Sequence, residues 1–369
     1  MQTGKPEHPL FLTLDGMRGV GGALVVIGHT VIFWGGLPTT SPPIPFCVDL
    51  FFLLSGFVIA FAYEPRFAAG LDAVSFLRQR FVRLYPLYFL GLVLGASVQM
   101  AVHAGDAGMG PVLMALGPQL LMLPSPDFNG SGDLYPLNMP AWTLLFELWA
   151  NIVYVLIWRW LSTRVLIGVV IVSAVLLAVC TISYGTLDQG PSWWNFWGGF
   201  ARAMFGFFAG VLVFRLVGSP KEPTKRRSWT AIPALFAVPV LCVIPQTPEL
   251  RPFIELGIVC LIGPLLLLWG QSVQPWQGFA KWFGRAGAVS YACYVLHYPL
   301  FELMKRLNWR FPALSAEFTP WTGIAILLVA LALSWWAEKY YDRPARRLLN
   351  AALKAILPAK KRPPMVAAE

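Results

Sequence analysis

The chain has 369 residues, of which 57% are hydrophobic and only 12% are charged, and its mean hydropathy is +0.62. This balance is far too apolar for a soluble domain and predicts a helical membrane protein. The formal net charge of +10 would suggest nucleic-acid binding in a soluble protein, but in a bilayer the orientation of the chain explains it. We therefore expect an all-α polytopic membrane protein that binds membrane lipid and no nucleic acid.

Ten apolar stretches are long enough, or nearly so, to cross about 30 Å of hydrocarbon. They are residues 17–34, 46–63, 85–103, 140–161, 164–185, 195–217, 229–245, 253–271, 286–304 and 321–341. A further stretch, 111–124, is short and contains Pro111, Gly117 and Pro118, so we expect it to be re-entrant or interfacial. Residues 1–358 are predicted to form one transmembrane domain, and 359–369 a disordered tail.

The basic residues predict the orientation of this domain. With ten spans and the N-terminus inside, 22 of the 28 Lys and Arg residues fall on inner segments and 4 on outer loops. Because inner loops of membrane proteins are rich in Lys and Arg, both termini are expected to be cytoplasmic. A spanning 111–124 segment would move every later loop to the other side and break this bias.

The first span carries an arginine and a histidine eleven residues apart, Arg18 and His29. On an α-helix this spacing is about 1100° of rotation, so both residues share one face, about 16 Å apart along the axis. Arg18 could instead be an interfacial anchor paired with Asp15 at i, i+3. His29 could cap a neighbouring carbonyl, but ionisable residues inside spans usually mark a pathway or a site.

Four more ionisable residues are expected at similar depth on four other spans: Asp49, Glu147, Arg202 and His297. They predict a shared polar cavity, and the alternative is a structural ion-pair network such as Glu147 with Arg202.

A basic segment, FLRQRFVRLYP at 76–86, precedes the third span. Its Arg80 and Arg83, at i, i+3, point one way. They could anchor the chain at anionic lipid or bind phosphate groups, for which the guanidinium fork is suited. A group of arginines at the cytoplasmic end of the spans, with a histidine nearer the outer side, suits a phosphorylated cytoplasmic donor and an acceptor that arrives from outside.

At these residues the sequence resembles the acyltransferase-3 family of bacterial membrane O-acyltransferases. Arg18 and His29 are similar to the Arg-x10-His signature of this family. The further motifs follow in family order along the chain. They are DLFFLLSGFVIA with Asp49, Ser55 and Gly56; RQRFVRLYPLY with Arg80, Arg83 and Pro86; PAWTLLFELW with Trp142, Glu147 and Thr143 in place of Ser; SYACYVLHYPL with Ser290, Tyr291, Tyr294, His297 and Pro299; and YYDRPARR, where Asp342 replaces the usual Glu.

The resemblance implies ten spans, an acyl-CoA donor with acetyl as the favoured acyl group, and a carbohydrate or lipid-linked glycan acceptor. It also implies the bacterial cytoplasmic membrane and, because the chain ends soon after its last span, the stand-alone form without an esterase-like domain. We expect no tightly bound cofactor and no metal site, since the histidines are not spaced as ligands.

Within this reading, His29 is expected to act as the general base on an acceptor hydroxyl. Glu147 is expected to orient His29 or to hold the sugar, and Arg18, Arg80 and Arg83 are expected to bind CoA phosphates. Candidates for acceptor binding or transition-state stabilisation are Asp49, Trp142, Arg202, Ser290, Tyr291, Tyr294, His297 and Asp342. A direct transfer and a covalent acyl-enzyme both remain open.

Two other classes of function compete with this one. A transporter or flippase of a lipid-linked glycan would also need intramembrane charges, but we find no internal repeat of the kind such proteins often carry. A non-enzymatic partner in a polysaccharide export complex would have no need to retain both Arg18 and His29. Activity of the purified protein that depends on acyl-CoA separates the enzyme from a transporter, and glycan acylation that survives deletion would favour the export partner.

Overall fold

The structure is a computed structural model that describes residues 11–33, 44–103, 109–127, 129–218, 229–242, 244, 247–311, 318–319 and 321–356. Across these ranges the regular structure is helical, and an isolated β-bridge joins Asp133 to Ser192. The expected tail at 359–369 lies outside the described residues, as does most of the segment 218–228 between the expected spans 195–217 and 229–245.

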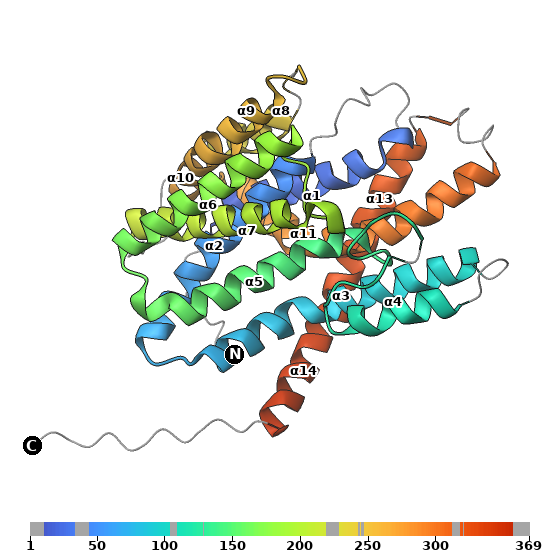
Figure 1. Ribbon diagram of the computed structural model, residues 1–369, viewed down its shortest axis with the longest axis horizontal. Helices are drawn as coiled ribbons and strands as arrows, with labels where there is room; N and C mark the ends of the chain where they lie inside the picture. The colour runs from blue at the N-terminus through green and yellow to red at the C-terminus, as the bar shows by residue number, and fades with distance from the viewer. Residues whose placement is uncertain are drawn as a thin grey trace, which may run out of the picture.

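The helices pack into one bundle, from which α14 projects (Figure 1). The α-helices are α1 (Leu12–His29), α2 (Ile44–Ala68), α3 (Ala73–His103), α4 (Gly110–Leu120), α5 (Trp142–Ile157), α6 (Thr163–Tyr184), α7 (Phe196–Val217), α8 (Ala231–Cys242), α9 (Arg251–Gly257), α10 (Gly263–Ser272), α11 (Gln277–Arg310), α13 (Trp321–Trp336) and α14 (Arg343–Ile356). Two π-helical turns, η5 (Ile258–Ile262) and η6 (Ala337–Asp342), join α9 to α10 and α13 to α14. Short 3₁₀ turns are η1 (Val31–Phe33), η2 (Met139–Ala141), η3 (Trp158–Trp160) and η4 (Trp193–Asn195).

Seven helical segments among the described residues are long and apolar enough to cross a membrane. They contain α2, α3, α5, α6, α7, α9 with α10, and α13 with α14. The prediction of an all-α polytopic membrane protein is therefore confirmed. The other three expected spans lie on α1, α8 and α11, and their crossing stays a prediction. Residues 111–124 coincide largely with α4, whose 11 residues rise only about 16 Å, well short of the hydrocarbon thickness.

The basic segment at 76–86 and the third span form one continuous helix, α3, with Pro86 inside it. The helix starts after Asp72, whose Oδ1 accepts a hydrogen bond of 2.9 Å from the backbone N–H of Ser75. This bond stabilises the charged carboxylate and lowers the pKa of Asp72. Arg80 and Arg83 are thus held on a rigid helix that enters the bundle.

Glycines let pairs of helices approach until their backbones touch. A Cβ atom on Gly56 of α2 would lie 1.9 Å from the carbonyl oxygen of Phe207 on α7. A Cβ atom on Gly19 of α1 would lie 2.5 Å from the Cβ of Ala286 on α11. Small residues provide such close contact where lipid gives helices little hydrophobic reason to associate. The second contact fixes α1, which carries His29, against α11, which carries His297.

The orientation predicted from the basic residues can be tested with two exposed positions, Ala69 between α2 and α3 and Asn129 between α4 and α5. We expect a membrane-impermeant maleimide to label Asn129→Cys in intact cells and to leave Ala69→Cys unlabelled. The parent protein has its native cysteines replaced by alanine, and permeabilised cells, in which both positions should react, serve as the control. Labelling of Ala69→Cys alone would refute the orientation.

Candidate active site

A cavity of about 910 Å³, which includes the space at its open end, lies between α1, α2, α3, α5 and α11. Pockets for small molecules typically measure about 300–1,000 Å³, so the space is large enough for a ligand. Its polar lining comes from Arg18, Ser55, Arg80, Arg83, Thr143, Glu147, Ser290, Tyr291 and Tyr294. The structure therefore brings together all three arginines expected at the donor site.

Glu147 is held by two cavity residues. Its Oε1 accepts a hydrogen bond of 2.6 Å from Arg80 and one of 2.9 Å from the hydroxyl of Ser55. The suggested pairing of Glu147 with Arg202 is wrong, and the carboxylate contacts Arg80 and Ser55 instead of orienting His29. The physical reason is that α3 and α2 place Arg80 and Ser55 beside Glu147 inside the cavity. Arg202, on α7, does not line this cavity.

Arg83 is the cavity arginine with the weakest protein partner. Its Nη1 lies 4.0 Å from Asp342 Oδ2 and makes no hydrogen bond within the described residues. The guanidinium sits 5.4 Å from the centre of the Tyr291 ring. Asp342 is instead bonded to Arg346, one helical turn further on. Since Arg346 takes the carboxylate, the Arg83 fork keeps hydrogen-bond donors for an anion in the cavity.

Arg18 combines both of its expected contacts. Its Nη2 lies 2.5 Å from Asp15 Oδ1, as the i, i+3 spacing predicts, and its side chain also lines the cavity. About a third of the Arg18 side chain is exposed. We name the end of the bundle that carries Arg18, Arg80 and Arg83 the arginine end.

Asp49 and Arg202 form a closed ion pair outside this cavity. The Nε and Nη2 atoms of Arg202 each lie 3.0 Å from a carboxylate oxygen of Asp49, and the two side chains are 1% and 2% exposed. Arg202 also donates to the carbonyls of Gln189 and Pro45, and its guanidinium lies 5.4 Å from the ring centre of Trp142.

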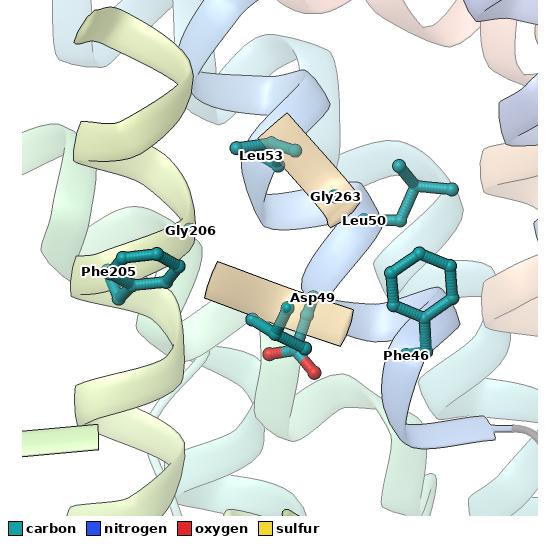
Figure 2. A pocket seen from close by; sticks show the side chains of 8 residues that line it. Phe46, Asp49, Leu50, Leu53, Phe205, Gly206 and Gly263 are labelled. Carbon is teal, nitrogen blue, oxygen red and sulfur yellow. The ribbon is translucent and has the colours of Figure 1, made fainter. Parts of the chain in front are cut away.

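Figure 2 shows Asp49 between α7, at Phe205 and Gly206, and the apolar side chains of Phe46 and Leu50. A charge pair that is fully buried and fully bonded fits a structural link between α2 and α7 rather than a substrate contact. The expectation of one shared polar cavity for Asp49, Glu147, Arg202 and His297 is therefore wrong.

His29 and His297 form a separate pair beyond the cavity. Their ring centres lie 5.0 Å apart, and His29 Nδ1 lies 3.3 Å from His297 Nε2. His297 is 1% exposed, whereas His29 is partly exposed. Neither lines the cavity, but Tyr294 does, and its ring centre lies 6.2 Å from that of His297. Tyr294 thus separates the cavity from the histidines.

The hydroxyl groups expected as candidates for transition-state stabilisation are engaged with backbone carbonyls. Ser290 donates to Gly287 at 2.8 Å, Tyr291 to Leu84 at 2.7 Å, and Tyr294 to Pro140 at 3.2 Å. A hydroxyl that already donates has to turn before it can stabilise an oxyanion.

Three neighbours of the site were not predicted. Tyr298 and Phe301 place their rings 5.8 and 6.5 Å from that of His29, and Arg346 bonds Asp342. The i, i+4 spacing of Asp342 and Arg346 could have indicated the last of these. Among the described residues, no group of three or more His, Cys, Asp or Glu could hold a metal ion.

Comparison with known proteins assigns a family to this arrangement. The acyltransferase-3 family model, described as an acyltransferase domain, matches residues 11–339. The chain belongs to the acyltransferase-3 family. It carries the six motifs of that family on the helices that surround the cavity and on η6 and the start of α14.

Two relatives extend this assignment. Protein 2 in the picA locus of Rhizobium radiobacter is 36% identical over 200 residues, which are 50% of this chain and all of that protein. The acyltransferase MdmB of Streptomyces mycarofaciens is 31% identical over 105 residues, 27% of this chain and 24% of that protein. No solved structure matches the chain. Membership of the acyltransferase-3 family supports membrane acyl transfer as the class of activity.

Proposed function

We propose that the protein transfers an acyl group, with acetyl favoured, from cytoplasmic acyl-CoA to a hydroxyl of an extracytoplasmic or lipid-linked glycan. The proposal places it in the bacterial cytoplasmic membrane with both termini inside. The observation that carries it is the cavity that begins among three arginines and ends at Tyr294, beside the histidine pair. A donor with phosphates at one end and a thioester at the other fits such a path.

The arginine end would hold the anionic part of the donor. Arg18 and Arg83 are both partly exposed in the cavity wall, and Arg83 lacks a close partner. Arg80 is engaged with Glu147, so an incoming phosphate would have to compete with that carboxylate. We assign Arg83 and Arg18 the main share of donor binding, and Glu147 the role of holding Arg80 in the cavity wall.

His29 would act on the acceptor. It lies about 16 Å along α1 from Arg18, so an extended donor bound at the arginine end brings its thioester near the histidine pair. The acceptor hydroxyl oxygen attacks the thioester carbonyl carbon, a C–O bond forms and the C–S bond breaks. The hydroxyl proton passes to His29 and then to the departing CoA thiolate, so that the ester and free CoA are the products.

Purified protein in detergent or liposomes tests the proposal. With radiolabelled acetyl-CoA and extracted cell-envelope glycans, we expect label to enter the glycan only when protein and acyl-CoA are both present. Mass spectrometry of glycans from wild-type and deletion strains identifies the modified residue and the acyl group. Unchanged acylation in the deletion strain would contradict the proposal and favour a transport or export role.

The role of Arg83 leads to a prediction for the donor. Arg83→Lys keeps the charge but loses the planar fork, and Arg83→Ala loses both. We expect each to weaken acyl-CoA binding by about 1–3 kcal/mol, the scale of a hydrogen bond to a charged group. Isothermal titration calorimetry with a non-hydrolysable acyl-CoA analogue measures this.

Arg66→Lys is the matched control for the same exchange. Arg66 lies at the exposed end of α2, bonds Gln79 and does not line the cavity. The Arg66→Lys variant should therefore leave the affinity for acyl-CoA unchanged. If both Arg83 variants bind acyl-CoA with wild-type affinity, Arg83 instead anchors the chain at anionic lipid.

A further inference from the structure

The nitrogen that faces a backbone carbonyl fixes the tautomer of each histidine in the pair. His29 Nδ1 lies 3.0 Å from the carbonyl oxygen of Val25, and His297 Nδ1 lies 3.1 Å from that of Cys293. A carbonyl oxygen can only accept a hydrogen bond, so we assign the hydrogen of each neutral ring to Nδ1. In the neutral rings both Nε2 atoms are then bare.

The bare Nε2 of His297 faces the N–H edge of its neighbour. It lies 3.3 Å from His29 Nδ1, so this N–H is shared between Val25 and His297 as a three-centre hydrogen bond. The opposite arrangement, with hydrogen on His297 Nε2, would set two nitrogen lone pairs against two carbonyl oxygens. It is excluded on electrostatic grounds.

Burial distinguishes the two histidines. His297 is 1% exposed and has no access to solvent, whereas His29 is partly exposed. With ring centres 5.0 Å apart, two imidazolium cations would repel each other, so only one ring can take a proton. We assign the proton to His29, the less buried of the two residues.

We propose that His297 is a positioning residue that accepts the Nδ1–H of His29, reserves His29 Nε2 as the basic nitrogen and stabilises the imidazolium that forms there. The proposal rests on the proposed function, in which His29 receives the proton of the acceptor hydroxyl. His297 then has the place that a carboxylate has in many catalytic triads. A neutral acceptor suits an apolar interior, because a carboxylate there would bring an extra buried charge.

The test compares two amides that differ by one methylene group. In His297→Gln the amide oxygen can reach the position of Nε2 and accept from His29, whereas in His297→Asn it falls short. We expect His297→Asn and His297→Leu to lower kcat by about tenfold to hundredfold, the scale seen for partners that orient metal-bound histidines. His297→Gln should stay within about threefold of wild type, and the KM for acyl-CoA should not change.

Phe301→Leu is the packing control. Phe301 contacts the His29 ring but makes no hydrogen bond to it, so its truncation should leave kcat near wild type. If Gln, Asn and Leu at position 297 give the same kcat, the positioning role is wrong. Because the two amides have similar polarity, their comparison remains decisive even if His297→Leu does not fold.

The outcome for His29 separates this inference from the function on which it rests. If His29→Ala is inactive and the position-297 variants are alike, only the positioning role falls. If His29→Ala transfers acyl groups normally, general-base catalysis by His29 falls, and the positioning role falls with it.

Discussion

His29→Ala is expected to lose acyl transfer by about 10²-fold or more, the usual scale for a general base, while the protein stays folded and binds acyl-CoA. Among the described residues, the side chain makes polar contacts with Val25 and His297 and no ion pair, and the residue is partly exposed, so its removal leaves no unpaired buried charge. Steady-state kinetics with acetyl-CoA and glycan, together with donor titration, give kcat and donor affinity separately.

Added imidazole provides a sharper readout. It should restore part of the activity of His29→Ala, because a free base can enter the space of the lost ring. Ile27→Ala, a truncation two residues earlier on α1, is the matched control and should keep both activity and donor affinity. A His29→Ala protein that transfers acyl groups at near wild-type rate would contradict general-base catalysis by His29.

Arg18→Ala should show a defect of a different kind. Arg18 lines the cavity at the arginine end, about 16 Å along α1 from His29. Its loss should mainly weaken donor binding and leave the rate at saturating donor less affected. If Arg18→Ala and His29→Ala lose kcat equally and both keep wild-type affinity for acyl-CoA, the two residues do not act on different parts of the donor.

The largest effect on stability is expected at the ion pair between α2 and α7. Asp49→Asn or Arg202→Met should each lower the free energy of unfolding by about 3–5 kcal/mol, because the remaining partner is left charged and buried. The double variant Asp49→Leu/Arg202→Met should recover much of this loss, since apolar side chains need no partner. Thermal unfolding in detergent, followed by tryptophan fluorescence, measures the effect.

Arg251→Met provides the matched control. Arg251 pairs with Glu255 at 3.0 Å on the same helix, but the Arg251 side chain is 24% exposed, and Glu255 also accepts a hydrogen bond from the backbone N–H of Leu187. Because water reaches Arg251 and Glu255 keeps this second bond, the variant should lose less stability than either single variant at position 49 or 202. If the single variants at positions 49 and 202 are as stable as wild type, the ion pair does not stabilise the contact between α2 and α7.

The sequence was sufficient to predict where the helices lie, but it was not sufficient to predict which polar residues of different helices pair with each other. Within the described residues, each expected span overlaps a helix, because long apolar runs have few other ways to satisfy their backbone groups in lipid. The i, i+3 contact of Arg18 with Asp15 also followed from spacing alone.

The longer-range pairs could not be predicted from spacing. Asp49 meets Arg202 across 153 positions, and His29 meets His297 across 268. Which charge meets which depends on how closely the helices approach and how each is rotated. Those features are set by glycine contacts such as Gly56 with Phe207, and the position of a residue within its own span carries no record of them.

The contact between α1 and α11 makes the site depend on glycines, which have no side chain to take part in its chemistry. Gly19 meets Ala286 where an added methyl group would lie 2.5 Å from the facing Cβ, and Gly287 meets Asp15 at the same distance. One methyl group there would wedge the two helices apart, and the histidines they carry would part with them. A lineage can therefore lose this enzyme by drift at a glycine about 15 Å from His29 while every charged motif stays intact. Genome surveys that count only those motifs would still record it as active.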